Sequence, residues 1–148
     1  MIKGSRAAKI DEKSRLRVPA EFRRYLSEAT DDNRYYVTSF DGRCAQIYPL
    51  PVWEKIEQKL QALPRTNQAK IKFQRITSYY GSIEEIDPQG RILIPAVLRS
   101  TAQIYGEVSV LGIDGDHLEV WNKDTIETDM KDNPVTNEDW DELSKLGI

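Results

Sequence analysis

Apolar and polar residues alternate strictly over residues 15–18. Leu16 and Val18 fall on one face of such a segment, and Arg15 and Arg17 fall on the other. A period of two is typical of a strand that buries one face. The pattern therefore predicts a short strand that buries two aliphatic side chains and points two arginines outward.

The same pattern returns 76 residues further along the chain. Residues 11–23 read DEKSRLRVPAEFR and residues 87–99 read DPQGRILIPAVLR, with an aspartate, two arginines, a proline and an alanine in common. In both segments the proline ends the strand and suits the first turn of a helix, because it lacks a backbone N–H. Each copy is therefore predicted to be a turn, a strand and a short helix.

Each copy is followed by a second shared segment, which reads YYVTSFDGRCAQIY at residues 35–48 and VSVLGIDGDHLEVW at residues 108–121. In both, Asp-Gly lies between two strand-like runs. Asp-Gly in this setting is a strong hairpin signal, since glycine readily adopts a positive φ. We therefore expect a β-hairpin in each half of the chain.

Helical spacing replaces this pattern between the two copies. Apolar residues recur at intervals of three and four over residues 51–63 and again over residues 67–80, which predicts two amphipathic helices. Pro64 ends the first helix and Gly81 ends the second. The two helices form a structured connection rather than a flexible linker.

These patterns divide the chain into four parts. The predicted parts are a first repeat at 5–52, a helical connector at 53–80, a second repeat at 81–124 and an acidic tail at 125–148. In the tail, Thr136 and Asp139 have the spacing of a capping box and predict a short last helix. Because a unit of about 50 residues buries little core by itself, the two repeats are expected to share one core. The predicted fold class is mainly β with flanking helices (α+β).

The composition is that of an ordinary soluble protein. Of the 148 residues, 39% are hydrophobic and 30% are charged. No apolar run approaches the ~18 residues that a membrane span needs, and the first residues lack an apolar signal region. The single cysteine, Cys44, cannot form an internal disulfide, which agrees with a reducing compartment. A cytoplasmic protein without a membrane partner is expected.

Charge is distributed unevenly along the chain. The net charge of −3 argues against a nucleic-acid partner, but residues 1–25 hold eight basic and three acidic side chains, whereas residues 124–148 hold two basic and eight acidic ones. The local field, not the net charge, decides what a surface attracts. One end of the chain is therefore suited to a polyanion and the other is not.

The sequence offers little for catalysis. There is one histidine, His117, and one cysteine, so no Cys/His metal cluster and no Cys–His nucleophile pair can form locally. His117 alternates with Leu118 after a turn and is expected to be an exposed strand residue. Glycine-rich phosphate-binding motifs are absent. We predict no catalytic residue, no metal site, no cofactor and no small-molecule substrate; the protein is not expected to be an enzyme.

The repeated turn is the most distinctive feature of the sequence. Asp11 and Asp87 can each accept backbone N–H groups and shape a tight turn. Arg15 and Arg91 then leave the turn with a planar, fork-shaped guanidinium that suits phosphate or guanine. The alternative is that each arginine only pairs with its aspartate across the turn, and such pairing is also compatible with binding.

The two turns differ in their surroundings. Lys9, Lys13 and Arg17 add positive charge around the first turn, whereas the second turn has Gln89 and Leu93 at the last two of these positions. If both turns bind a polyanion, the first is expected to bind it more tightly.

The two DxxxR segments, together with IYPLPVWEKIEQKLQALP and HLEVW, resemble the MraZ proteins within the AbrB/SpoVT class of bacterial transcription factors. The resemblance covers nearly the whole chain to about Asp124. It implies two AbrB-like swapped-hairpin halves that form one double-split β-barrel, and it implies a ring-shaped homo-oligomer.

The resemblance also implies an activity. MraZ-like proteins bind double-stranded DNA at repeated G-rich boxes in the promoter of the division and cell-wall gene cluster and regulate transcription there, which implies a nucleoid-associated protein. The implied DNA-facing residues are Arg15 and Arg91, with Asp11, Asp87 and Gly90 shaping the turns. This chain departs from the family at Ser14, where a glycine is usual. If the position needs a positive φ, Ser14 is strained.

These features bear on three candidate functions. The leading hypothesis is a sequence-specific DNA-binding transcriptional regulator. The second is an AbrB-type protein-interaction module, such as an antitoxin-like barrel whose acidic tail wraps a partner; an antitoxin is usually shorter, with one barrel copy. The third is an enzyme that uses carboxylates, for which the sequence offers no pocket signature.

Overall fold

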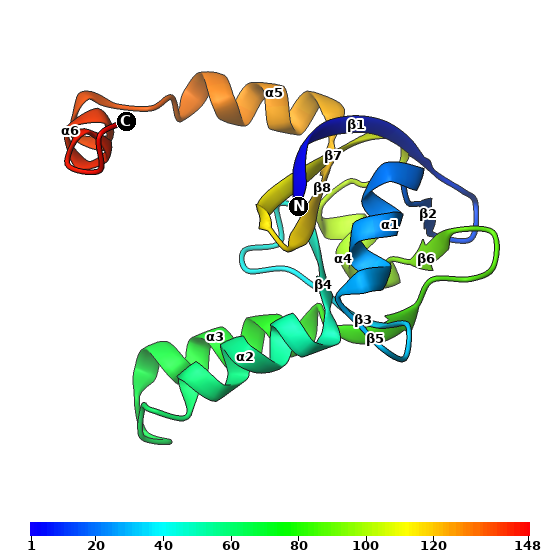
Figure 1. The fold of residues 1–148 in the computed structure, drawn as a ribbon, viewed down its shortest axis with the longest axis horizontal. Helices are drawn as coiled ribbons and strands as arrows, with labels where there is room; N and C mark the ends of the chain where they lie inside the picture. Colours follow the sequence, from blue (N-terminus) through cyan, green and yellow to red (C-terminus); the bar gives the residue numbers. More distant parts are fainter.

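The computed structural model describes residues 1–148, which form an eight-stranded antiparallel sheet that is nearly closed into a barrel (Figure 1). Along the sheet the strands follow the order β5-β3-β4-β8-β7-β1-β2-β6. The strands are β1 (Ile2–Ile10), β2 (Arg15–Arg17), β3 (Arg34–Thr38), β4 (Ala45–Pro49), β5 (Ser82–Glu85), β6 (Arg91–Leu93), β7 (Gly106–Gly115) and β8 (His117–Asn122). The predicted fold class, a barrel that is mainly β with flanking helices, is confirmed.

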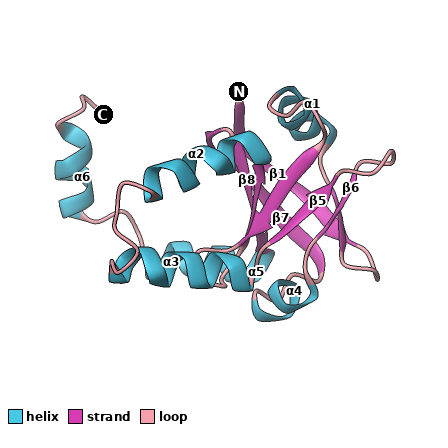
Figure 2. Cartoon of the chain, turned by 90° about the horizontal axis from the view of Figure 1, so that it is seen from below, coloured by secondary structure: helices cyan, strands magenta, loops and turns pink.

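Six helices flank the barrel, and none combines the length and the apolarity needed to cross a membrane. They are α1 (Ala20–Glu28), α2 (Leu50–Leu60), α3 (Gln68–Tyr79), α4 (Ala96–Thr101), α5 (Lys123–Asp132) and α6 (Asn137–Ser144). Figure 2 shows α1 and α4 against the barrel, and α2 and α3 side by side as they project from it. The tail helix α6 begins with the predicted capping box of Thr136 and Asp139.

Helix α5 was not predicted. It carries a single buried residue, Ile126, so its sequence lacks a clear apolar stripe. Its start is fixed by Asn122, whose side chain accepts a hydrogen bond from the backbone N–H of Thr125. A side-chain cap of this kind stabilises the first turn of a helix.

The two repeats interlock rather than lie side by side. Strand β2 of the first repeat pairs with β6 of the second, and β1 pairs with β7 along most of its length. Beyond the strands, Val18 donates its N–H to the carbonyl of Gly90 at 2.9 Å, and Ile94 donates to the carbonyl of Ser14 at 2.8 Å. Each half therefore completes the backbone hydrogen bonding of the other.

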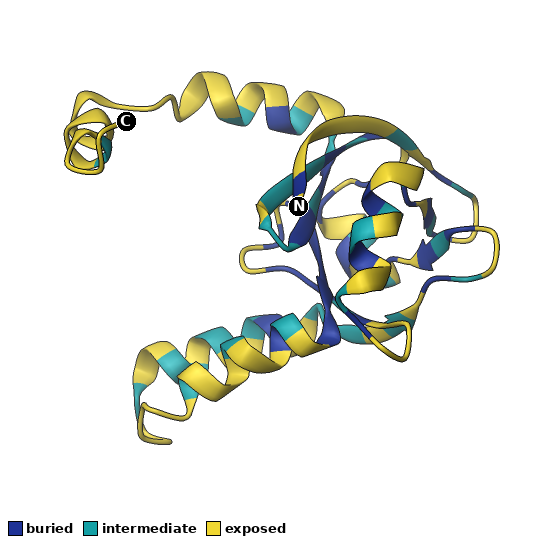
Figure 3. Cartoon of the chain, in the orientation of Figure 1, coloured by how far each residue is buried: buried dark blue, intermediate teal, exposed yellow.

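One core lies inside the barrel and takes side chains from both repeats (Figure 3). Leu16 and Phe22 of the first repeat, and Ile92 and Leu98 of the second, are at most 1% exposed. The alternation of apolar and polar residues in the two copies therefore has the predicted phase. Because this core is continuous, unfolding of one half exposes the apolar face of the other.

The expectation that His117 is exposed was wrong. The side chain is buried, and its ring stacks on that of Tyr48 with centroids 4.2 Å apart. Its Nδ1 atom lies 2.8 Å from a carboxylate oxygen of Asp116. His117 pairs with Ile113 of β7, and its side chain, which leaves the plane of the sheet, is covered by the ring of Tyr48 on β4.

Candidate nucleic-acid interface

The turn between β1 and β2 is organised by the carboxylate of Asp11. One oxygen accepts the backbone N–H groups of Lys13 and Arg15 at 2.9 and 3.0 Å, and the other accepts Nε of Arg15 at 2.8 Å. The hydrogen bond from the backbone of Arg15 is the largest cause of a lowered pKa at Asp11. The side chain of Arg15 thus leaves the turn in one fixed direction, with its Nη atoms free of hydrogen bonds within the chain.

The turn between β5 and β6 repeats this arrangement around Asp87. Its carboxylate accepts the N–H groups of Gln89 and Arg91, both at 2.9 Å, and Nε of Arg91 at 3.0 Å. The pKa of Asp87 is lowered as well, again chiefly by the backbone hydrogen bond from the arginine. The two turns are therefore equivalent in their frame, and each aspartate pairs with its arginine while also shaping the turn.

Both turns need a residue with a positive φ directly before the arginine. Gly90 has φ 82°, and Ser14 has φ 63°, so the departure from the family's glycine places a serine in a strained backbone conformation. The strain is accompanied by a specific contact: Nη1 of Arg99 donates to Oγ of Ser14 at 3.0 Å. A glycine at this position would lose that hydrogen bond.

Arg23 and Arg99, the last residues shared by the two copies, each reach across to the turn of the other repeat. Arg99 binds Ser14, and a Cβ atom placed on Gly90 would lie only 1.7 Å from Nη1 of Arg23. Arg99 also lies over the ring of Tyr105, with 4.8 Å between its guanidinium carbon and the ring centroid. Each of these two arginines therefore lies against the residue with a positive φ in the turn of the other repeat: Arg99 against Ser14 and Arg23 against Gly90.

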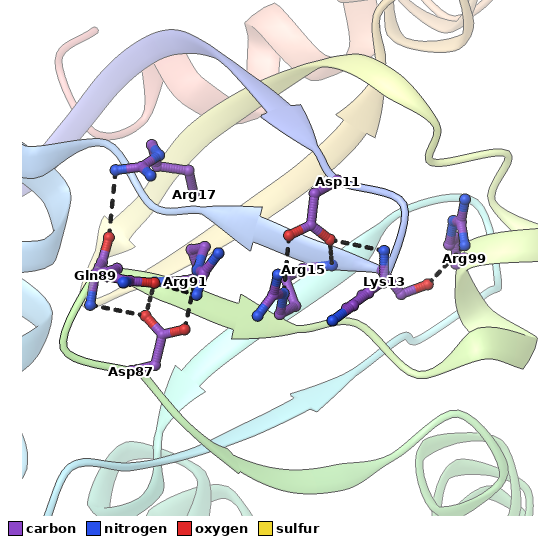
Figure 4. A network of polar contacts seen from close by, with 9 residues as sticks. Asp11, Lys13, Arg15, Arg17, Asp87, Gln89, Arg91 and Arg99 are labelled. Carbon is purple, nitrogen blue, oxygen red and sulfur yellow. Dashed lines mark hydrogen bonds and ion pairs between the residues drawn. The ribbon is translucent and has the colours of Figure 1, made fainter.

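The pairing of β2 with β6 forms a two-stranded ribbon with a turn at each end (Figure 4). Arg17 lies opposite Arg91 in this pairing, and Arg15 lies opposite Leu93. The outward face of the ribbon therefore carries three arginines within a few residues of one another. The side chains of Arg15 and Arg91 are only about a quarter exposed, 29% and 24%, which limits the directions in which they can move.

Four of the five predicted binding residues line one groove of about 630 Å³. They are Lys9, Arg15, Arg17 and Arg91. Lys13, the fifth, lies outside the lining at the exposed tip of the first turn. Arg23 also lines the groove and was missed by the sequence analysis, although its recurrence as Arg99 in the second copy was a usable signal. Contact with DNA stays a prediction for all of these residues.

A family model described as "MraZ protein, putative antitoxin-like" matches residues 1–76 and 83–139 of the chain. The chain belongs to the MraZ family. A protein of Acidobacterium capsulatum named transcriptional regulator MraZ is 43% identical over the full length of both chains, and its namesake in Koribacter versatilis is 42% identical, also over both full lengths. A third, from Pelotomaculum thermopropionicum, is 41% identical over 84% of this chain and 81% of its own.

Membership of the MraZ family extends further along the chain than the resemblance in the sequence motifs suggested. The matched range continues past Asp124 to residue 139, so it includes the whole of α5 and the start of α6. Both DxxxR turns also lie inside the matched ranges. The residues that line the groove of arginines, and the whole of α5, therefore lie within the range that the family model matches.

Proposed function

We propose that the chain is a transcriptional regulator that binds double-stranded DNA in a sequence-specific manner through the β2–β6 ribbon and its two turns. The observation that carries this proposal is the pair of arginines, Arg15 and Arg91, that two aspartates hold on one ribbon. The names of the relatives, which are transcriptional regulators, support it.

The geometry suits reading of bases in the major groove, which admits a two-stranded ribbon. An arginine can donate two hydrogen bonds to O6 and N7 of guanine, and the terminal Nη atoms of Arg15 are available for this. The contact from Asp11 to Nε fixes the side chain without occupying those atoms. An arginine that is already oriented loses less rotational freedom when it binds.

Lys9, Lys13 and Arg17 are proposed to contact phosphates. Such contacts position a protein on the duplex and add affinity without reading sequence. The groove that holds Lys9 and Arg17 also contains Arg23. Binding is therefore expected to combine two base-reading arginines with several sequence-independent cations in each chain.

A single chain has few contacts for a specific regulator. Two bidentate arginines supply about 1–3 kcal/mol each. We propose a ring-shaped homo-oligomer that presents many turns to repeated G-rich boxes, because linked sites bind far more tightly than one. The proposed target is the promoter of the bacterial division and cell-wall gene cluster, and the proposed location is the cytoplasm, on the nucleoid.

An electrophoretic mobility assay on the region upstream of that cluster tests the proposal. The full chain should retard this fragment at concentrations that leave a scrambled fragment of the same length free. Equal retardation of both fragments would show sequence-independent binding and contradict the proposal. Failure to retard either fragment at low salt would exclude DNA as the ligand.

The family description as antitoxin-like favours one second candidate, a protein-interaction module of the AbrB type. In that case the acidic tail, rather than the arginine ribbon, makes the essential contacts with a partner protein. The double variant Arg15→Ala/Arg91→Ala separates the candidates, since a DNA-binding ribbon loses its base-reading side chains and a tail-bound partner keeps its site.

A further inference from the structure

The C-terminal helix α6 has no partner within its own chain. All hydrogen bonds of residues 136–148 stay within that segment, and none of the residues in α6 is buried. Trp140 on this helix is 51% exposed, and Leu146, just beyond it, is 77% exposed. Isolated helices shorter than about 12–15 residues are marginal in water. A helix of eight residues with a large exposed aromatic side chain is therefore expected to gain stability by packing against another surface.

Helix α5 directs α6 away from the body of the chain. It is held against the barrel by Ile126, which packs with Cys44 and Trp121, and by an ion pair between Arg43 and Asp129. Figure 1 shows α6 beyond the far end of α5, off the barrel. The position of α6 is thus set by an anchored helix and a short linker, and it leaves the apolar side of α6 open.

A groove beside α2 has the apolar lining that such a helix needs. It lies between α2 and the hairpin ends of the barrel, has a volume of about 420 Å³, and is lined by apolar side chains that include Phe40, Ile56 and Phe73. Phe40 is 40% exposed, and its ring meets that of Phe73 edge-on at 5.2 Å. Lys55 and Lys59 form the basic rim of this groove.

Charge distinguishes the two surfaces. The helical connector, residues 53–80, has six basic and two acidic side chains, whereas residues 123–148 have three basic and eight acidic ones. Four of those acids, two on each side of Trp140, lie in α6 itself: Glu138, Asp139, Asp141 and Glu142. Asp114 and Asp116 also line the groove. Lys145, directly after α6, has the opposite charge and can pair with either of them.

We propose that α6 of one copy docks in the α2 groove of a second copy, with Trp140 between Phe40 and Ile56 and the acidic residues of α6 beside Lys55 and Lys59. This inference rests on the proposed homo-oligomer and is independent of the contacts with DNA. It gives α6 the apolar partner that its own chain does not supply. It also explains how the acidic tail is kept away from the arginine ribbon.

Sedimentation of full-length Trp140→Ala against the unaltered chain is the first test. Central aromatic residues dominate interfaces, so the concentration at which half the chains are assembled should rise at least about tenfold. Tyr105→Ala is the matched control, because Tyr105 is similarly exposed at 48% but lies outside both surfaces. Assembly unchanged by Trp140→Ala, or an unaltered chain that is monomeric at all concentrations, would overturn the proposal.

Cysteine cross-linking then identifies the two surfaces. A Lys55→Cys chain and a tagged Asp141→Cys chain, both of which keep Phe40 and Trp140, are mixed and oxidised; Cys44 stays unreactive, because burial raises the pKa of its thiol. A mixed disulfide dimer is expected, and a Tyr105→Cys chain paired with Asp141→Cys should give none. Absence of the mixed dimer, or equal yields from the two pairings, would refute docking between copies.

DNA retardation by the same preparations separates this inference from the proposed function. A protein that assembles through α6 but retards no DNA leaves the docking intact and refutes DNA binding. A protein that binds the promoter fragment as a monomer refutes the docking and leaves DNA binding intact.

Discussion

The two turns of the barrel orient their arginines through the same hydrogen bonds, but they leave different numbers of guanidinium N–H groups available to a ligand. In both, an aspartate accepts two backbone N–H groups and the Nε of the arginine, at distances between 2.8 and 3.0 Å. At the second turn, however, Nη2 of Arg91 also donates to the side chain of Gln89. At the first turn, Lys13 stands in place of that glutamine and leaves Arg15 free.

Arg17 makes the two ends of the ribbon differ further. Its Nη1 atom donates to the backbone carbonyl of Gln89 at 3.3 Å and so ties the second turn to β2. The equivalent residue of the second repeat is Leu93, whose side chain has no hydrogen-bond donor. The shared Asp–Arg frame therefore orients each guanidinium, while the neighbouring residues decide how many of its N–H groups remain for a ligand.

Replacing Arg15 by Ala should have the largest effect on binding. Each base contact supplies about 1–3 kcal/mol, and every subunit of an oligomer loses it at once, so affinity for the promoter fragment should fall at least about 100-fold. The melting temperature should change little, since the backbone N–H groups of Lys13 and Arg15 that hold Asp11 survive the substitution. Binding isotherms and thermal melts measure both, with Arg65→Ala in the exposed α2–α3 loop as the control. Normal binding with a lowered melting temperature would mean that the Asp–Arg pair is a structural clasp.

Arg91→Ala should weaken binding less, by about tenfold, because Gln89 already occupies part of this guanidinium. The companion variant Gln89→Lys makes the second turn resemble the first and should raise affinity and steepen the salt dependence. Isotherms at two salt concentrations test both variants. If Arg91→Ala lowers affinity as much as Arg15→Ala, the two turns contribute equally and the contact with Gln89 does not limit Arg91.

Lys13→Ala should lower affinity for every DNA sequence by a similar, modest factor. A lost phosphate contact reduces the slope of log K against log salt by about 0.9 for each site in B-DNA. The measurement compares promoter and scrambled fragments over a range of salt. A loss confined to the promoter fragment would instead place Lys13 against a base.

Substitutions of the residues directly before the arginines should change the free energy of unfolding rather than the affinity for DNA. Gly90→Ala forces a Cβ into the left-handed region and against Arg23, and should cost about 1–3 kcal/mol. Ser14→Gly relieves the same backbone strain but removes the hydrogen bond from Arg99, so the two effects should cancel to within about 1 kcal/mol. Chemical denaturation gives both values. A large loss in Ser14→Gly would mean that the contact with Arg99 outweighs the strain.

The smallest effect concerns pH. Because the pKa of Asp87 and of Asp11 is lowered below 3.8 in the folded chain, their carboxylates stabilise the fold at neutral pH and down to that value. The stabilisation is lost as pH falls through the lowered values. Asp11→Asn and Asp87→Asn should therefore reduce stability by similar amounts at pH 7, and the difference from the unaltered chain should shrink below pH 4. Unequal losses would show that one turn is held by other contacts.

Local features of the sequence determined the elements of this protein and the candidate residues. Alternation, proline and Asp-Gly signals act over a few residues, and they predicted strands β2 and β6 and the helices that follow. Asn67 and the capping box at Thr136 marked the starts of helices for the same reason, since a cap acts within one turn; α2 ends at Leu60, earlier than Pro64 predicted. Internal repetition singled out Arg15 and Arg91 because the same side chain recurs after the same turn.

Only the tertiary structure decided how the two halves combine. The pairing of β2 with β6 and the reach of Arg23 to Gly90 join residues far apart in the chain, and such contacts leave no local pattern. The same holds for His117, which the ring of Tyr48, 69 positions earlier in the chain, buries although the local alternation suggests an exposed residue. A side chain's surroundings depend on which segments the fold brings against it. Here the interlocking of the two repeats places an arginine of each repeat against the turn of the other.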